Sequence, residues 1–457
     1  MAAKCGGENE KTPCNCCEAK QETSSPFTIL HKYQSQVKRF KRGNTITPAP
    51  VATPHAQHQH LPSAEAIVRL AKLRLLHKTP QDSENLRDVE LVLEAGEKLS
   101  QHKFECAEML LDKCILISDK NAAGGRAVKF FAEALRERLD SETGKIDLER
   151  KAFDLEECLL TYQSVILACE DKLPSSQIAQ FTAIQAILDS IGSAKTIHLI
   201  DFGIKSGLHW SVMIQGLASR GHGRLKITAL GSSGDRLEET GRRLSSFAHS
   251  MKLPFVFKSV VAELDKDGVE QQLVEGGGPD EAVMVYSGLH LWSKLATPSK
   301  LTTFLKFVKK LNPCVMVVNE IEADTNSSSL VERLCGALPF TIATFDCLDT
   351  CLRGEARCRN VVEEVFFRSM IQSIITAEEE EEGTSHRHAK IGFWREMFAE
   401  FDIVETELSS LCLDQARFMI NRNADWSNCT LQMDGKCMIV GWRGTPLQSI
   451  SAWKIHH

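Results

Sequence analysis

Long apolar runs are missing from this chain of 457 residues. No stretch of about 18 or more apolar residues occurs, which excludes a typical membrane-spanning helix. The first ten residues, MAAKCGGENE, are polar and contain no apolar signal core, so we do not expect secretion. The 16 cysteines should then be free thiols in a reducing compartment.

Recognisable catalytic and metal-binding motifs are also missing. The sequence contains no nucleophile elbow, phosphate loop, HExxH pair or Cys/His/Asn grouping. A zinc site usually combines two CxxC-like pairs of ligands across a folded spacer, and the potential ligands near the N-terminus lack a second pair. A disordered segment without metal is therefore favoured over a metal centre. These ligands are Cys5, Cys14, Cys16, Cys17, His55, His58 and His60. We therefore expect neither a bound metal nor a cofactor.

The charge of the chain is unevenly distributed. Its formal net charge is −6, but residues 1–62 carry eight Lys or Arg against four Glu, a balance of +4 that leaves −10 for the remainder. Residues 1–62 also show little apolar periodicity and are expected to be a disordered basic leader. Residues 63–457 have the composition of a globular domain and an acidic balance, so DNA contact should be weak or indirect.

A basic cluster lies within this leader, at Lys38, Arg39, Lys41 and Arg42. Such a cluster is typical of a nuclear import signal or a nucleic-acid contact, although a solvated basic stretch is the alternative. In the C-terminal part of the chain, the run Glu378–Glu382 is expected to be a solvated loop. The alternative with a specific function is an acidic patch that binds a partner.

Residues 63–190 follow a helical pattern. In AVKFFAEALRERL, for example, Val128, Phe131, Ala132 and Leu135 recur at spacings of three and four. These positions could form a coiled-coil face for a partner, but the pattern is not sustained over several heptads, so a helical core is favoured.

Residues 191–457 change to alternating strands and helices. Short apolar runs at 196–203, 225–231, 255–260, 281–288 and 313–322 alternate with helical stretches, which predicts a parallel, doubly wound sheet. Residues 430–454 read as two strands around Asp434-Gly435, a terminal antiparallel hairpin. The expected fold class is α/β: a helical cap on a Rossmann-like core that ends in this hairpin.

One stretch resembles a catalytic fingerprint, IHLIDFGIKSGLHW. A strand ends at Asp201, and Gly203 and Gly207 precede a helix, as in the first motif of Rossmann-type methyltransferases. Lys205 in the loop and the lack of an acid at the end of the next strand both disfavour an adenosyl cofactor. Asp201 could instead cap the following helix. The isolated His198, His209 and His290 are expected to be hydrogen-bonded structural residues.

The same stretch carries a family resemblance. Ile197, His198, Leu199, Ile200 and Asp201, followed by GLHW, resemble the VHIID motif of GRAS proteins. FAEAL at 131–135 and FTAIQAIL at 181–188 are similar to phrases that precede this motif in the family. RLEETGRRLSSFA at 236–248, the PFYRE-like region from Leu338 to WREMF, and the SAW motif at Ser451, Ala452 and Trp453 follow it in the family's order.

This resemblance implies a methyltransferase-related core that carries the VHIID, second leucine-rich, PFYRE-like and SAW regions. It also implies that the protein is a transcriptional co-regulator and not an enzyme, located in the nucleus and in part in the cytoplasm. Its expected partners are transcription factors and other GRAS proteins, as homo- or heterodimers, in hormone or developmental signalling. The sequence looks nearest to the DELLA branch, yet residues 1–62 contain neither DELLA nor TVHYNP. We therefore expect no gibberellin-triggered destruction.

An alternative function class rests on the Asp201–Gly207 turn, which could serve a small-molecule-binding or methyltransferase-like protein, or be the vestige of such a site.

At the other end of the chain, Trp453 lies four residues from the C-terminus. Terminal residues are mobile unless tied down, so an aromatic there predicts that this segment docks on the core.

Overall fold

The computed structural model describes residues 80–118, 122–146, 157–158, 161–221, 223–262, 264, 266, 268–274, 280–376 and 387–456. These residues do not include positions 1–62, with their basic cluster, cysteines and histidines, or the run Glu378–Glu382. No helix within the described ranges is long and apolar enough to cross a membrane.

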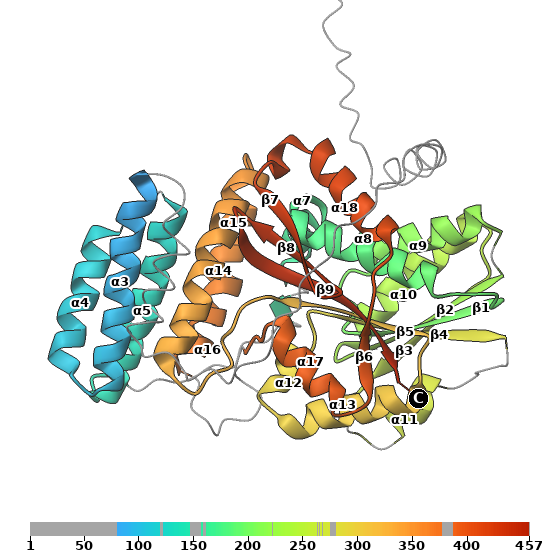
Figure 1. The fold of residues 1–457 in the computed structure, drawn as a ribbon, viewed down its shortest axis with the longest axis horizontal. Helices are drawn as coiled ribbons and strands as arrows, with labels where there is room; N and C mark the ends of the chain where they lie inside the picture. The colour runs from blue at the N-terminus through green and yellow to red at the C-terminus, as the bar shows by residue number, and fades with distance from the viewer. Residues whose placement is uncertain are drawn as a thin grey trace, which may run out of the picture. The chain divides into compact units, whose positions relative to one another are not determined.

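A helical bundle forms the N-terminal part of the described chain. It contains α3 (Pro80–Ser100), α4 (Phe104–Ile117) and α5 (Ala123–Glu142). Helices α3 and α5 pack against α14 (Leu330–Cys351), α5 also packs against α16 (Arg368–Thr376), and α4 packs on α3 and α5, as Figure 1 shows. The apolar positions predicted on one face of α5 are fully buried here, namely Val128, Phe131, Ala132 and Leu135. They form a core within the bundle, as favoured from their spacing.

Two helices from the segment predicted as a cap lie elsewhere. Helix α8 (Pro174–Asp189) contacts β5, β8 and β9 of the central sheet, and α7 (Gln163–Lys172) packs beside α8. Helical periodicity shows which face of a helix is buried but not which element covers it. The sequence therefore did not reveal that α14 and α16, rather than α7 and α8, complete the bundle.

The central sheet begins with five parallel strands: β1 (Thr196–Phe202), β2 (Arg224–Gly231), β3 (Phe255–Val261), β4 (Glu281–Gly288) and β5 (Val315–Ile321). Their order is β3-β2-β1-β4-β5, and every adjacent pair is parallel. All five predicted strands are confirmed. The order reverses between β1 and β4, and such a switch point is where open α/β sheets bind ligands.

The C-terminal strands extend this sheet with antiparallel pairs. The predicted hairpin is confirmed as β7 (Cys429–Asp434) and β8 (Cys437–Trp442), but a further strand, β9 (Thr445–Ile455), follows a second turn at Arg443-Gly444. Strand β9 lies antiparallel to β5, and β6 (Ile403–Thr406) also pairs with β9. The second turn was missed because Arg443 adopts a positive φ of 48°, which arginine rarely does.

Helices cover both faces of the sheet, which confirms the doubly wound class. One face packs on α11 (Val269–Val274), α12 (Trp292–Leu295), α13 (Pro298–Leu311) and α17 (Ile391–Ala399) through a continuous apolar core. The other face carries α8, α9 (Leu208–Ser219) and α10 (Gly234–Ser250), with α18 (Ser410–Arg422) packed on α8. Side chains alternate between faces along a strand, so Phe202 enters the apolar core while Asp201 points the other way.

Candidate functional site

The turn between β1 and α9 has the conformation expected of a ligand-binding loop. Gly203 has φ +84°, and its amide donates to the Leu230 carbonyl of β2. Gly207 has φ +64° and is the N-cap of α9; a Cβ added there would lie 2.7 Å from Cγ2 of Thr240. Both positions therefore require glycine, as predicted for a tight strand-to-helix turn.

Asp201 is buried at the carboxyl end of β1. The indole Nε1 of Trp210 donates a 2.7 Å hydrogen bond to its Oδ2, whereas its Oδ1 has no protein partner. Burial raises the pKa of Asp201 to about 7, opposed by the Trp210 hydrogen bond and by the charges of Arg236 and Lys205. The expectation that Asp201 caps α9 is wrong, because the chain extends through Gly207 before the helix starts and the carboxylate turns to Trp210.

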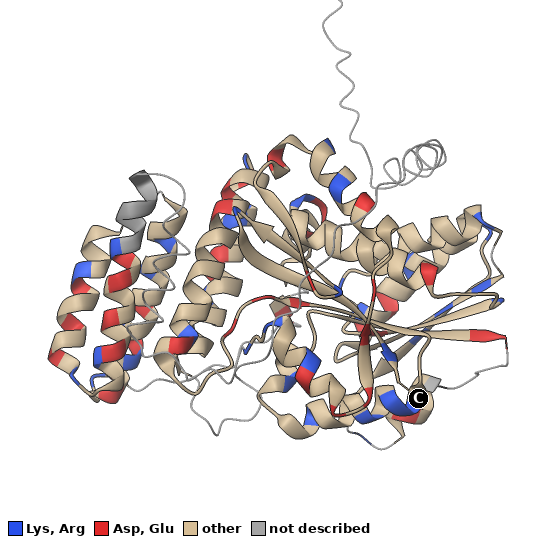
Figure 2. Ribbon diagram, viewed as in Figure 1, with Lys and Arg blue, Asp and Glu red and all other residues tan. Residues whose placement is uncertain are grey.

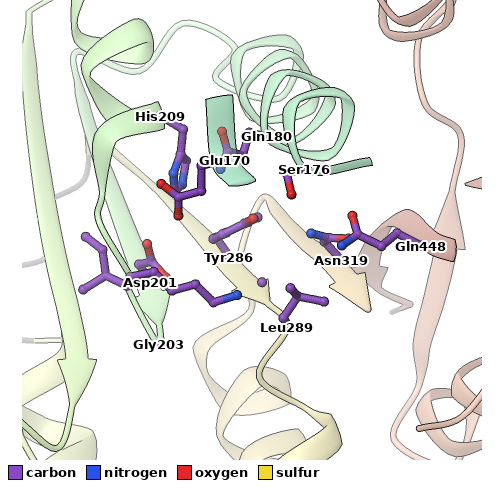
Figure 3. A pocket seen from close by; sticks show the side chains of 13 residues that line it. Glu170, Ser176, Gln180, Asp201, Gly203, His209, Tyr286, Leu289, Asn319 and Gln448 are labelled. Atoms are coloured by element: carbon purple, nitrogen blue, oxygen red, sulfur yellow. The ribbon is translucent and has the colours of Figure 1, made fainter. Parts of the chain in front are cut away.

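A small cavity of about 50 Å³ lies at the carboxyl ends of β1, β4 and β5, beneath α7 and α8 (Figure 3). Its lining includes Glu170, Asp201, Gly203, Lys205, His209, Tyr286, Asn319 and Gln448. Of the turn residues predicted from sequence, Asp201 and Gly203 line the cavity, while Gly207 instead positions α9.

Several polar atoms around this cavity are buried without a protein hydrogen-bond partner. They include both ring nitrogens of His209, Oδ1 of Asn319 and Oε1 of Gln448. Burial lowers the pKa of His209 to about 3, so its ring is neutral, and it packs against Trp210 with ring centroids 4.3 Å apart. The expectation that His209 is a hydrogen-bonded structural histidine is thus wrong, because its neighbours are aromatic rings.

His198 lies on the opposite face of β1 from the cavity. Its Nε2 is 2.8 Å from the Thr228 hydroxyl and its Nδ1 is 2.8 Å from Oε1 of Glu281, so a hydrogen-bonded structural role is confirmed. Burial lowers the pKa of His198 to about 3. Ile197, Leu199 and Ile200 are fully buried in the sheet core. Of the five residues that resemble VHIID, the structure thus brings only Asp201 to the cavity.

The three SAW-like residues occupy β9. Ser451, Ala452 and Trp453 are all buried, and the Trp453 indole donates a 2.8 Å hydrogen bond to the Ser451 hydroxyl. Trp453 also packs edge-on against Phe398 of α17, with ring centroids 4.7 Å apart. The C-terminal segment is therefore docked on the core, as predicted. None of the three residues lines the cavity, although Gln448 of the same strand does.

The end of β5 contributes a polar pair that sequence reasoning missed. Asn319 lines the cavity, and Oε1 of the adjacent Glu320 accepts hydrogen bonds from the amides of His290 and Leu291. Burial raises the pKa of Glu320 to about 7, although these amide hydrogen bonds oppose the shift. An apolar strand that ends in Asn-Glu was the available signal in VMVVNEI, whereas Gln448 carried none.

The residues around the turn do not fit an adenosyl cofactor. In nucleotide-binding sheets an acid at the end of the second strand holds the ribose hydroxyls, but β2 ends at Gly231 and the nearest acid, Asp235, is exposed on α10. The Arg236 guanidinium fills this place and donates to the carbonyls of Ile204 and Lys205. The cavity is also far below the roughly 300 Å³ at which ordinary ligand sites begin.

The described residues provide no cluster of three or more His, Cys, Asp or Glu suited to a metal ion. Every cysteine within the described ranges is a free thiol. Burial raises the pKa of several of these thiols, for example that of Cys412 to about 11, so they are not activated nucleophiles.

Known proteins share both the sequence and the fold of this chain. A model of the GRAS domain family matches residues 89–454. DELLA protein RGL1 from Arabidopsis thaliana is 28% identical over 374 residues, which cover 81% of this chain and 70% of that protein. DELLA protein DWARF8 from Zea mays is 27% identical over 81% of this chain, and the match spans 61% of DWARF8.

A solved structure agrees with these sequence matches. The crystal structure of SCL7 from Oryza sativa superimposes with a TM-score of 0.69 at 25% identity, covering 82% of this chain and all of that one. The resemblance of the VHIID-like and SAW-like stretches, the family match over four-fifths of the chain and the shared fold agree with one another. The chain therefore belongs to the GRAS domain family of plant regulatory proteins.

Proposed function

We propose that this protein is a nuclear transcriptional co-regulator that acts through contacts with transcription factors in hormone or developmental signalling. Membership of the GRAS family supports the regulatory role. The basic cluster at Lys38, Arg39, Lys41 and Arg42 supports nuclear import. A dimer with another GRAS chain is the further contact that we expect.

An apolar surface on the helical bundle carries the protein-contact part of this proposal. Three large apolar side chains of α4 are exposed: Met109 at 69%, Leu116 at 85% and Ile117 at 40%. They recur at helical spacing and form one stripe, which we call the α4 stripe. Exposed apolar residues that gather on one face are typical of protein-binding sites, and a stripe of this kind suits an amphipathic helix of a transcription factor.

Figure 2 shows that acidic and basic residues are interspersed along the described helices and strands. The residues after the leader also have a negative balance. A continuous basic surface is what gives proteins affinity for the DNA backbone. The charge pattern therefore supports contact with protein partners over direct, tight binding to DNA.

A substitution in the α4 stripe tests this proposal. Met109→Glu places a carboxylate within the apolar contact, and we expect it to abolish capture of transcription factors by the full chain in nuclear extracts. Ser245→Glu is the matched control, because it adds the same charge at an exposed position on α10. The melting temperature of both variants should stay unchanged. Equal capture by both variants would refute the binding of partners at the α4 stripe. A drop in melting temperature for Met109→Glu alone would show that the α4 stripe is instead packed against other residues of this chain.

A further inference from the structure

Arg333 of α14 is a buried cation that lacks a counter-ion among the described residues. Its side chain is 3% exposed. Its guanidinium donates only to carbonyl oxygens, from Nε to Ile374 and from Nη1 to Ser327 and Ser328. Within the described part of the chain no carboxylate pairs with it, and its Nη2 has no acceptor. Buried charges are normally paired, so this arginine is short of an anion that would offset its burial.

The charges nearest to Arg333 are also positive. Burial lowers the pKa of Arg333 to about 10, and the charges of Arg138 and Arg387 act in the same direction. Arg138 of α5 is engaged by Glu142 and by the Ile375 carbonyl of α16. Helices α5, α14 and α16 pack on one another, as Figure 1 shows. An anion at this junction would therefore stabilise Arg333.

The guanidinium of Arg333 lies at the N-terminus of its own helix, beside the carbonyls that precede the N-cap. Ser329 is the N-cap of α14, and its hydroxyl accepts a 3.4 Å hydrogen bond from the amide of Glu332. Ser329 is exposed and stands four residues before Arg333, a spacing that makes two side chains neighbours on a helix. The first amides of a helix have no partner within it and carry partial positive charge. An anion on the Ser329 hydroxyl would thus meet these amides and Arg333 together.

An ordinary capping box is the simpler explanation of part of this pattern. Ser329 and Glu332 have the spacing of such a box, and Oε2 of Glu332 accepts from the Ser327 hydroxyl. A capping box does not explain why a buried arginine is turned toward the cap without a carboxylate partner among the described residues. A serine followed three residues later by an acid is, moreover, the pattern that acidophilic protein kinases recognise.

We propose that Ser329 is a phosphorylation site whose phosphate is held by Arg333 and the first amides of α14. A protein kinase transfers the γ-phosphoryl group of ATP: a bond forms between Oγ of Ser329 and the γ-phosphorus, and the bond from that phosphorus to the β–γ bridging oxygen breaks. ADP leaves, and the hydroxyl proton passes to the base of the kinase. The phosphate carries about −1.5 to −2 charges at pH 7 and three acceptor oxygens, which supplies the anion that Arg333 lacks.

The phosphate would act on the contact between two helices of the bundle. Arg333 holds the Ile374 carbonyl of α16 through its Nε, so fixing its guanidinium also fixes the end of α14 against α16. This site is separate from the α4 stripe, and its test measures neither partner capture nor location in the cell. Either proposal can therefore fail without the other.

Phosphoserine incorporated at position 329 of the full chain during translation tests the site directly. Phosphorus NMR measures the second pKa of the phosphate, which is about 6 for phosphoserine without such neighbours. We expect a value of about 5 at position 329, because the arginine and the amides stabilise the dianion. Phosphoserine at position 410 is the matched control, since Ser410 is exposed in the first turn of α18 but stands four residues before Asp414 instead of an arginine.

Two variants identify the group that holds the phosphate. Arg333→Met removes the guanidinium and should raise the phosphate pKa at position 329 to that at position 410. Arg138→Met keeps Arg333 and its three carbonyl contacts in place and should raise the pKa by a smaller amount. Arg242→Met, at an exposed position on α10, is the control and should leave it unchanged.

A phosphate pKa at position 329 that is no lower than that at position 410 would overturn the site, whichever variants fold. An unchanged pKa in a folded Arg333→Met variant would also overturn it. Mass spectrometry of the tagged full chain purified from plant cells tests whether the modification occurs. We expect phosphate on Ser329 and its loss from this peptide in Ser329→Ala, whereas a peptide with no phosphate at Ser329 would contradict its role as a modification site.

Discussion

Asp201 is a buried carboxyl group whose ionisation opposes folding at neutral pH. Its pKa rises from 3.8 to about 7 because burial removes water from the carboxylate. A carboxyl group with a raised pKa in the folded state contributes stability below its unfolded pKa. That contribution is lost as the pH rises from about 4 through 7.

Asp201→Asn should therefore stabilise the protein at neutral pH. The amide keeps an acceptor for Trp210 and needs no ionisation, so we expect the free energy of unfolding to rise by roughly 2 kcal/mol at pH 8. Near pH 4 the gain should vanish, because the natural carboxyl is then protonated in the folded state. Urea unfolding at both pH values measures the difference. A gain of the same size at both would show that ionisation of Asp201 is not its cause.

Trp453 is a second residue with a large expected effect. It is 1% exposed and packs against Phe398, so Trp453→Ala should lower the free energy of unfolding by about 3–5 kcal/mol. That is a large share of the roughly 5–15 kcal/mol typical of a domain. Trp292→Ala, at a half-buried position, is the comparison and should cost less. An unchanged melting temperature together with lost partner capture would instead make Trp453 a contact for partners.

A partly buried ion cluster joins the helical elements of the bundle. The Arg126 guanidinium of α5 donates 2.9 Å hydrogen bonds to Asp349 of α14 and to Glu363 of the π-helix Val362–Phe367. Glu363 is 4% exposed, and Arg359 also lies 4.0 Å from it. Segments more than 200 residues apart in sequence are therefore held together by one arginine.

Arg126→Met should loosen the bundle while the sheet stays intact. Losing one partner of a buried ion pair typically costs about 3–5 kcal/mol, because the remaining charge is left uncompensated. Here Arg359 stays 2.9 Å from Asp349 and 4.0 Å from Glu363, so we expect a smaller loss. We expect faster amide hydrogen exchange in α3, α4 and α5 than in the unmodified chain, with the β1 amides still protected. The double variant Arg126→Met/Glu363→Gln should recover part of the loss. If it is no more stable than Arg126→Met, charge compensation is not the role of this cluster.

Elements with strong local patterns could be predicted from the sequence. The five parallel strands are continuous apolar runs bounded by polar turns, and the hairpin carries Asp434-Gly435, so each pattern identified its own element. The neighbours of α7, α8 and α14 depend on contacts across hundreds of residues, and periodicity does not encode such contacts. For the same reason, only part of the cavity lining could be predicted. Asp201 and Gly203 belong to one local turn, whereas Asn319 and Gln448 lie at the cavity because of the order of the strands in the sheet.

At the scale of the whole molecule, the basic leader and the acidic remainder predict how the full chain meets DNA. Binding to a random duplex should be weak and steeply salt-dependent. Replacing Lys38, Arg39, Lys41 and Arg42 by Ala should reduce the slope of log affinity against log salt by up to about 3 or 4, since each phosphate contact contributes about 0.9. Fluorescence anisotropy over a range of salt concentrations measures it. Tight, salt-tolerant binding that survives these substitutions would make the folded part a DNA-binding domain.

Proximity labelling of the full chain in plant cells tests most directly whether this GRAS protein works in the nucleus by contacting transcription factors. A labelling enzyme fused to the chain should accumulate in nuclei and mark sequence-specific transcription factors. The same fusion carrying Met109→Glu should reach nuclei but lose that label, while Ser245→Glu retains it. Exclusion of the unmodified chain from nuclei, or labelling confined to cytoplasmic or membrane proteins, would contradict a nuclear role through transcription factors.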